Sequence, residues 1–231
     1  FGRIDALYQK REALGLTEEQ ARLLEVTWKS FMRSGAALPD AQRTRLAAID
    51  EQLAKLNTEF GQKVVADQKA GDTLLSAAEM AGMPDSFRAA AADRAGKAGK
   101  PGMFLVGATR SDFEAFMTQA TNRAAREKVF HAFDERGSNA NANNTGDTIK
   151  QMVSLRLERA KLLGFKSHAD FQLANAMAET PEAAQALMDQ VYQAGLAQAK
   201  KEEADLQKLA TADGISKLEP WDWRFYSEKV R

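Results

Sequence analysis

Two histidines, His131 and His168, occur in the chain of 231 residues, and there is no cysteine. A helical zinc site of the His-Glu-x-x-His type needs two imidazoles one turn apart, with a glutamate between them to activate water. Neither histidine has a second histidine four residues away. His131 has Glu135 at that spacing, a pair that could bind a metal weakly, but it is more typical of a surface or half-buried helix histidine beside a carboxylate. The sequence predicts no catalytic and no metal-binding residue, and it leaves substrate-binding residues open.

Other residue types that support catalysis also lack the required spacing. His168 stands at the start of a predicted helix, where we expect a structural role. There is no thiol nucleophile and no Gly-x-Ser-x-Gly turn. Glu202, Glu203 and Asp205 stand among lysines, a pattern that indicates a solvated helix face with local ion pairs rather than a catalytic carboxylate pair.

A glycine-rich segment from Gly96 to Gly102 contains Lys97 and Lys100. Lysines among glycines suggest a phosphate-binding loop, but the spacing Gly, four residues, Gly-Lys and Ser or Thr is not met. We therefore predict a flexible turn.

The densest apolar cluster is Trp221, Trp223, Phe225 and Tyr226. These residues could form a ligand platform or line a substrate channel. Packing in a core or against a missing part of the protein is the interpretation that the pattern favours.

Composition limits the possible partners. The apolar fraction is 44% and the charged fraction 28%, as in ordinary folded proteins. Lys plus Arg and Asp plus Glu both number 32, so the net charge is zero and indicates neither nucleic acid nor an anionic membrane surface as a partner. No apolar run is long enough for a membrane span. A cysteine-free chain without a signal sequence suits a reducing compartment, and we expect a cytoplasmic location.

Helical spacing of apolar residues predicts an all-α, mainly helical fold. Thr17 with Gln20 and Ser111 with Glu114 predict capping boxes, and Thr180-Pro181-Glu182 predicts another helix start. One short strand is expected near 103-106, with a partner that the sequence does not identify.

A predicted long helix after Pro39 has an apolar seam that favours packing against a neighbouring helix over a free coiled coil. The seam comprises Leu46, Ile49, Leu53, Leu56, Phe60 and Val64.

We expect three segments along the chain. Residues 1-70 form N-terminal helices, including the long helix. Residues 71-137 contain short helices, the glycine-rich turn and the strand. Residues 138-231 begin with an asparagine-rich linker and continue with long helices and the aromatic segment. Because the chain starts at Phe1 and stops inside that segment, we expect it to be a piece of a longer protein.

Several segments together resemble the M3 family of zinc metallopeptidases, the group of peptidyl-dipeptidases and oligopeptidase A. Weaker matches extend along nearly the whole chain, and the peptidyl-dipeptidase branch is the more similar. The segments are Leu155-Arg156-Leu157-Glu158-Arg159-Ala160, Leu162-Leu163-Gly164-Phe165, Met177-Ala178-Glu179-Thr180-Pro181-Glu182 and Pro220-Trp221-Asp222-Trp223.

The resemblance implies a helical, two-lobed body with a deep channel that admits short peptides. It implies zinc held by the two histidines of His-Glu-x-x-His and a later glutamate, and removal of C-terminal dipeptides. Since that motif is absent here, the chain resembles the N-terminal helical lobe, inactive alone and partnered by the catalytic lobe of the same polypeptide. An exposed aromatic C-terminal end could also promote self-association. The alternative is a stand-alone helical protein-interaction module.

Overall fold

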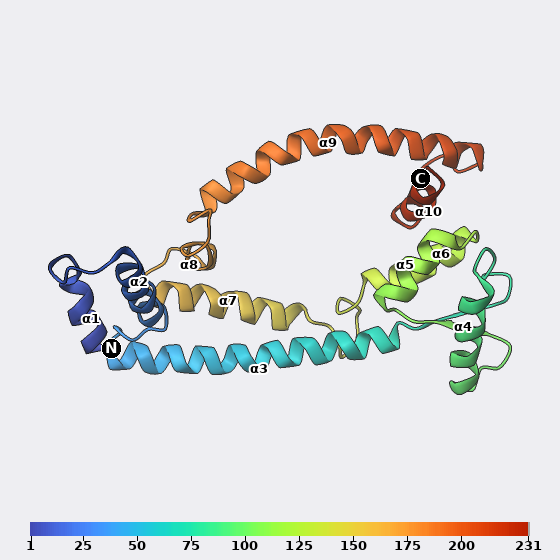
Figure 1. Ribbon diagram of the computed structural model, residues 1–231. Helices are drawn as coiled ribbons and strands as arrows, with labels where there is room; N and C mark the ends of the chain where they lie inside the picture. Colours follow the sequence, from blue (N-terminus) through green and yellow to red (C-terminus); the bar gives the residue numbers. More distant parts are fainter. Residues whose placement is uncertain (231) are drawn as a thin grey trace. The chain divides into compact units, whose positions relative to one another are not determined.

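Helices make up most of the computed structural model, which describes residues 1–230 (Figure 1). The helices are α1 (Gly2–Gln9), α2 (Glu18–Arg33), α3 (Asp40–Ala70), α4 (Asp85–Lys97), α5 (Arg110–Gln119), α6 (Arg123–Asp134), α7 (Gly146–Leu162), α8 (His168–Leu173), α9 (Pro181–Ala212) and α10 (Pro220–Val230). A 3-10 turn covers Arg11–Ala13, and the strands are β1 (Thr73–Leu75) and β2 (Phe104–Val106). The predicted all-α class with a minor β element is confirmed. Among residues 1–230, no helix is both long and apolar enough to cross a lipid bilayer.

Two of the three predicted helix starts are correct. Gln20 N donates to Thr17 Oγ1 at 3.3 Å and Thr17 N donates to Gln20 Oε1 at 3.1 Å, which completes the capping box of α2. Thr180 Oγ1 accepts from Ala183 N at the start of α9. The Ser111 box is wrong: Thr109 caps α5, accepting from Asp112 N at 3.2 Å, so the helix starts earlier than expected.

The missing strand partner is β1. It pairs with β2 antiparallel, with Thr73 opposite Val106 and Leu75 opposite Phe104. Arg94 of α4 donates from Nε to the Leu105 carbonyl oxygen at 3.0 Å, which ties this small sheet to a helix. The predicted strand is therefore confirmed, and its partner lies earlier in the chain.

The chain folds as two compact units. The first contains Phe1–Thr58 and Thr148–Leu187, and the second contains Glu59–Asp147 and Met188–Arg231. Each unit therefore combines two stretches that are distant in sequence, and the division falls inside α3 and inside α9.

In the first unit, α7 runs alongside α3 (Figure 1). Arg45 of α3 forms a two-pronged ion pair with Glu158 at 2.6 and 2.7 Å, and Arg159 Nε donates to Asp50 at 2.7 Å. These ion pairs are largely exposed and contribute little, whereas the seam residues Leu46 and Ile49 are buried. The expectation that the seam packs against a neighbouring helix is supported.

In the second unit, the hydrophobic core lies between the small sheet and α4, α5 and α6. Phe113 stacks on Phe133 with ring centroids 4.0 Å apart. The buried core residues are Leu75, Met80, Met83, Ala91, Val106, Phe113, Phe116, Met117, Ala120, Ala125 and Val129.

The asparagine-rich stretch after α6 is organised around one buried carboxylate. Asp67 of α3 accepts from Gly137 N at 2.7 Å, Asn139 Nδ2 at 2.8 Å and Asn141 Nδ2 at 2.7 Å. The amides of Asn141 and Asn139, followed by the Gly137 N–H, hold the pKa of Asp67 below its ordinary value. The expected linker is thus a loop fixed by hydrogen bonds to α3.

Replacing Gly82 with alanine should destabilise the second unit. Gly82 has φ +85°, and an added Cβ would lie 2.5 Å from the Gln119 carbonyl oxygen. Left-handed backbone and steric overlap together should lower the free energy of unfolding by about 2–4 kcal/mol in urea denaturation. The control is Gly96→Ala in α4, where the added Cβ meets nothing within 4 Å; it should raise stability by about 0.5–1 kcal/mol. Equal effects of the two substitutions would contradict the left-handed backbone of Gly82 and its close approach to the Gln119 carbonyl oxygen.

Stability should depend on Glu79 in a pH-dependent way. Its carboxylate accepts from Lys128 Nζ at 2.5 Å and from Ser76 N and Oγ at 2.8 Å, and these bonds lower its pKa to about 2. The unfolded chain takes up this proton first, near the ordinary value of 4.5, so the contribution is complete above that pH and is lost as pH falls toward 2.

Glu79→Gln should therefore lower the free energy of unfolding by about 1–2 kcal/mol at neutral pH, a modest amount because Lys128 is partly solvated. The difference in free energy of unfolding between the variant and the unaltered chain, called the gap below, should become smaller in acid. Urea denaturation at several pH values measures the gap. Asp93→Asn, which removes an exposed ion pair with Lys97, is the control with a small effect. A gap for Glu79→Gln that stays constant with pH would be inconsistent with the described bonds.

Candidate functional site

His131 lies exposed on α6, with its Nδ1 2.9 Å from Glu135 Oε1. The structure therefore places this pair on a helix surface, as expected for a surface histidine with a carboxylate four residues later. Within residues 1–230, no group of three His, Cys, Asp or Glu side chains is arranged to hold a metal ion.

His168 begins α8, where Ser167 provides the cap by accepting from Asp170 N at 3.2 Å. Burial lowers the pKa of His168, and the nearby positive charges of Arg156 and Arg159 lower it further. Its Nδ1 is buried without a hydrogen-bond partner in the described part of the chain, and its ring stacks near Phe171. The ring therefore lies in apolar contact, and the expected structural role stays a prediction.

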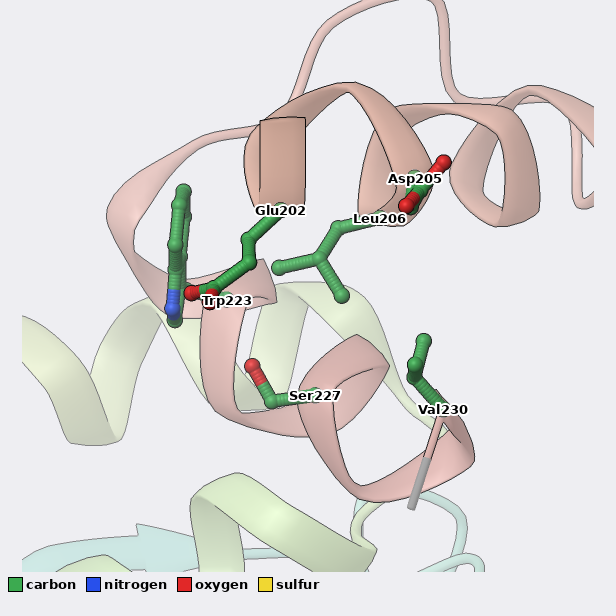
Figure 2. Close-up of a pocket in the computed structure, with 6 residues that line it drawn as sticks. All are labelled: Glu202, Asp205, Leu206, Trp223, Ser227 and Val230. Atoms are coloured by element: carbon green, nitrogen blue, oxygen red, sulfur yellow. The ribbon is translucent and has the colours of Figure 1, made fainter. Parts of the chain in front are cut away.

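A groove of about 370 Å³ lies between α9 and α10 in the second unit (Figure 2). Glu202, Asp205 and Leu206 come from one face of α9, at i, i+3 and i+4. The residues from α10, at i, i+4 and i+7, are Trp223, Ser227 and Val230. Figure 2 shows the Glu202 side chain extending toward the indole of Trp223. Two helix faces therefore present two carboxylates, an indole and a hydroxyl to one hollow.

A small apolar cluster packs α9, α10 and the segment that connects them against one another. Its members are Leu206, Ala210, Phe225 and Tyr226, with Ile215 and Leu218 packed against them.

Polar contacts reinforce the same connection. Asp213 accepts from Tyr226 Oη at 3.1 Å and pairs with Lys229 Nζ at 2.9 Å. Burial and then the Asp213 carboxylate raise the pKa of Tyr226 to about 12, so its hydroxyl remains a donor. The connection between α9 and α10, the two helices that line the groove, is therefore held by both packing and hydrogen bonds.

A buried ion pair fixes the opposite side of α10 to α6. Asp222 has no exposed surface and accepts from Arg123 Nη2 and Arg126 Nη2, both at 2.8 Å. Arg126, with 1% of its surface exposed, also donates to the carbonyl oxygens of Ala120 at 2.8 Å and Trp221 at 3.1 Å. Burial alone would raise the pKa of Asp222, but the bonds from Arg123 and Arg126 outweigh it and lower this pKa.

The expected exposed aromatic end, with uncovered surface around Trp221, Trp223 and Phe225, is wrong for Phe225. Phe225 and Tyr226 are 9% and 1% exposed, because α10 directs them toward α9 and α6. Trp221 is half-buried against the core beside Phe130, whereas Trp223 is 38% exposed. Packing in a core therefore describes Phe225 and Tyr226, whereas Trp223 stays exposed, and self-association through this end stays a prediction.

Sequence reasoning missed both the groove and the buried ion pair. The groove carboxylates were assigned to a solvated face, and the helical spacing of Trp223, Ser227 and Val230 was the available signal. The spacing of Arg123 and Arg126 signals two guanidinium groups on one helix face, but nothing local identifies Asp222 as their partner. Neither histidine lines the groove.

Comparison with known proteins matches residues 116–231 to peptidase family M3. The chain is 35% identical to the dipeptidyl carboxypeptidase of Escherichia coli, over 100% of this chain and 34% of that protein. It is 31% identical to oligopeptidase A of Haemophilus influenzae, over 98% of this chain and 34% of that protein. It is also 31% identical to a probable cytosolic oligopeptidase A of Arabidopsis thaliana, over 100% of this chain and 34% of that protein. The chain thus spans about a third of the length of the curated relatives it matches.

Arg126→Met should be strongly destabilising, because it leaves the Asp222 charge buried with one fewer partner. We expect a loss of about 3–5 kcal/mol in the free energy of unfolding, measured by urea denaturation. Arg123→Met is the matched control on the same carboxylate; its side chain is 39% exposed, so about 1 kcal/mol is expected. Equal losses would argue against a central role for Arg126.

Proposed function

The chain belongs to peptidase family M3, and from this premise we propose that it is the N-terminal helical part of a zinc metallopeptidase. The observation that carries the proposal is the alignment of the whole chain with about a third of the E. coli dipeptidyl carboxypeptidase. The sequence also lacks His-Glu-x-x-His throughout its 231 residues. The zinc motif then belongs to a part of the protein other than these residues.

Zinc, the metal that the family implies, does not fit the residues described here. Its usual sites need three or four nitrogen, sulfur or oxygen ligands in tetrahedral arrangement. Residues 1–230 offer no such group, and His131 and His168 stand on separate helices, α6 and α8. We therefore assign no catalytic step to this chain.

The role that we propose for the chain is to shape the channel through which short peptides reach the catalytic lobe. The mainly helical fold of the chain supports it. Removal of C-terminal dipeptides is the proposed activity of the whole protein, because identity is 35% to a dipeptidyl carboxypeptidase and 31% to the oligopeptidases A named above.

The proposed partner of this chain is the catalytic lobe of the same polypeptide. One face of α9 in the second unit supports this, since Met188, Val191 and Tyr192 follow helical spacing and all are more than half exposed. An apolar stripe of this kind marks a surface that another element covers. Neither nucleic acid nor a membrane is proposed as a partner, given the zero net charge.

We propose a cytoplasmic location for the protein. The cysteine-free sequence supports it, as does the cytosolic name of the Arabidopsis relative.

The second candidate is a stand-alone helical interaction module. The same exposed face of α9 favours it, because such a stripe also suits a separate protein partner. The two candidate functions differ in the partner that covers this face. Only the first predicts that an M3 catalytic lobe binds it.

The purified chain should show no peptide hydrolysis, with or without added zinc. The assay measures dipeptide release from blocked tetrapeptides with free C-termini by mass spectrometry, with the E. coli dipeptidyl carboxypeptidase as the positive control. The residues described contain no metal-binding group, which is the reason for the expected result. Release of dipeptides that a chelator abolishes would overturn the proposed non-catalytic role.

A further inference from the structure

The groove between α9 and α10 carries an uneven charge. Glu202 and Asp205 line it, and none of its six lining residues is Lys, Arg or His. Asp205 pairs with Lys208 at 2.8 Å in an exposed ion pair. The carboxylate of Glu202 accepts from the side-chain amide of Gln198 at 3.0 Å. Because that amide is uncharged, the bond does not neutralise the negative charge of Glu202. The groove therefore favours a positively charged occupant.

An indole borders the same space. Trp223 is 38% exposed, and Figure 2 shows the Glu202 side chain extending toward it. A tryptophan face attracts a guanidinium or ammonium group, and guanidinium groups also stack on it. A cation seated here would contact an aromatic ring and a carboxylate together, which is a stronger arrangement than either contact alone.

The remaining lining residues suit the rest of an amino-acid side chain. Leu206 and Val230 offer apolar surface for an aliphatic stem, and Ser227 offers a hydroxyl that can bond a peptide amide. The volume of about 370 Å³ lies at the lower end of the range for small-ligand pockets, about 300–1,000 Å³.

We propose that the groove between α9 and α10 binds the cationic side chain of an arginine or lysine residue in a peptide. The inference goes beyond the channel-shaping role and stands on the groove alone, whether or not the chain is part of a peptidase. A free amine lacks the peptide amide that Ser227 would bond, so the peptide-borne side chain is the better fit.

The test uses the whole chain and two blocked tripeptides, acetyl-Ala-Arg-Ala-amide and acetyl-Ala-Gln-Ala-amide. NMR follows the indole N–H signals of the three tryptophans, and Trp223→Phe identifies the signal of Trp223. The arginine peptide should shift that signal in a saturable manner, and the glutamine peptide should not. The signals of Trp28 and Trp221 should stay in place, because neither lines the groove.

Glu202→Gln and Glu203→Gln form the matched pair of variants. Both positions are exposed on α9, but only Glu202 lines the groove. Glu202→Gln should weaken binding of the arginine peptide by about fivefold, while Glu203→Gln should change it by less than about twofold. Unchanged circular dichroism would show that both variants fold.

Four results would overturn the proposal: no saturable shift of Trp223 with the arginine peptide, equal binding of the glutamine peptide, equal weakening by both variants, or binding of putrescine as tight as that of the arginine peptide. The first three would reject the cationic site, and the last would reject the peptide as its occupant.

Discussion

The buried contact between Arg126 and Asp222 determines where α10 lies. A charge removed from water is tolerated only when partners replace its hydration, and here each nitrogen of the Arg126 guanidinium and each oxygen of the Asp222 carboxylate has a hydrogen-bond partner. Arg126 donates to Asp222 and to the carbonyl oxygens of Ala120 and Trp221, while Arg123 and the Glu219 N–H complete the coordination of Asp222. These bonds are directional, so they fix the rotation of α10 about its axis as well as its distance from α6.

That rotation decides what each face of α10 can do. With Asp222 turned to α6, Phe225 and Tyr226 reach the apolar cluster with Leu206 and Ala210, and Trp223 remains on the outer side. The groove with Glu202 thus depends on a contact made on the opposite side of the helix. Asp67 acts similarly elsewhere in the second unit, where its carboxylate orders a polar loop through the Gly137 N–H and two asparagine amides. In both places a buried acid arranges the neighbouring surface through its hydrogen bonds.

Local signals in the sequence predicted local structure well. The Thr17 capping box, the Thr180-Pro181 helix start and the strand at Phe104–Val106 each depend on neighbouring residues, and each was found. The cap of α5 is Thr109 rather than the predicted Ser111. Either hydroxyl satisfies the sequence pattern of an N-cap, and only packing decides between them. The partners of Asp67 and Arg126 lie roughly 70 and 96 residues away, respectively, so no periodicity reveals them. The candidate groove was missed for the same reason, since its two walls meet only after α10 is docked.

Native-state hydrogen exchange would test most directly whether this ion pair docks α10. The measurement compares the amides of Phe225 and Tyr226 in α10 with those of Val129 and Phe130 in α6. If the ion pair joins the two helices into one cooperative unit, both sets should exchange with the same opening free energy. Fast exchange of the α10 amides while the α6 amides stay protected would contradict the account, because α10 would then open without breaking the core.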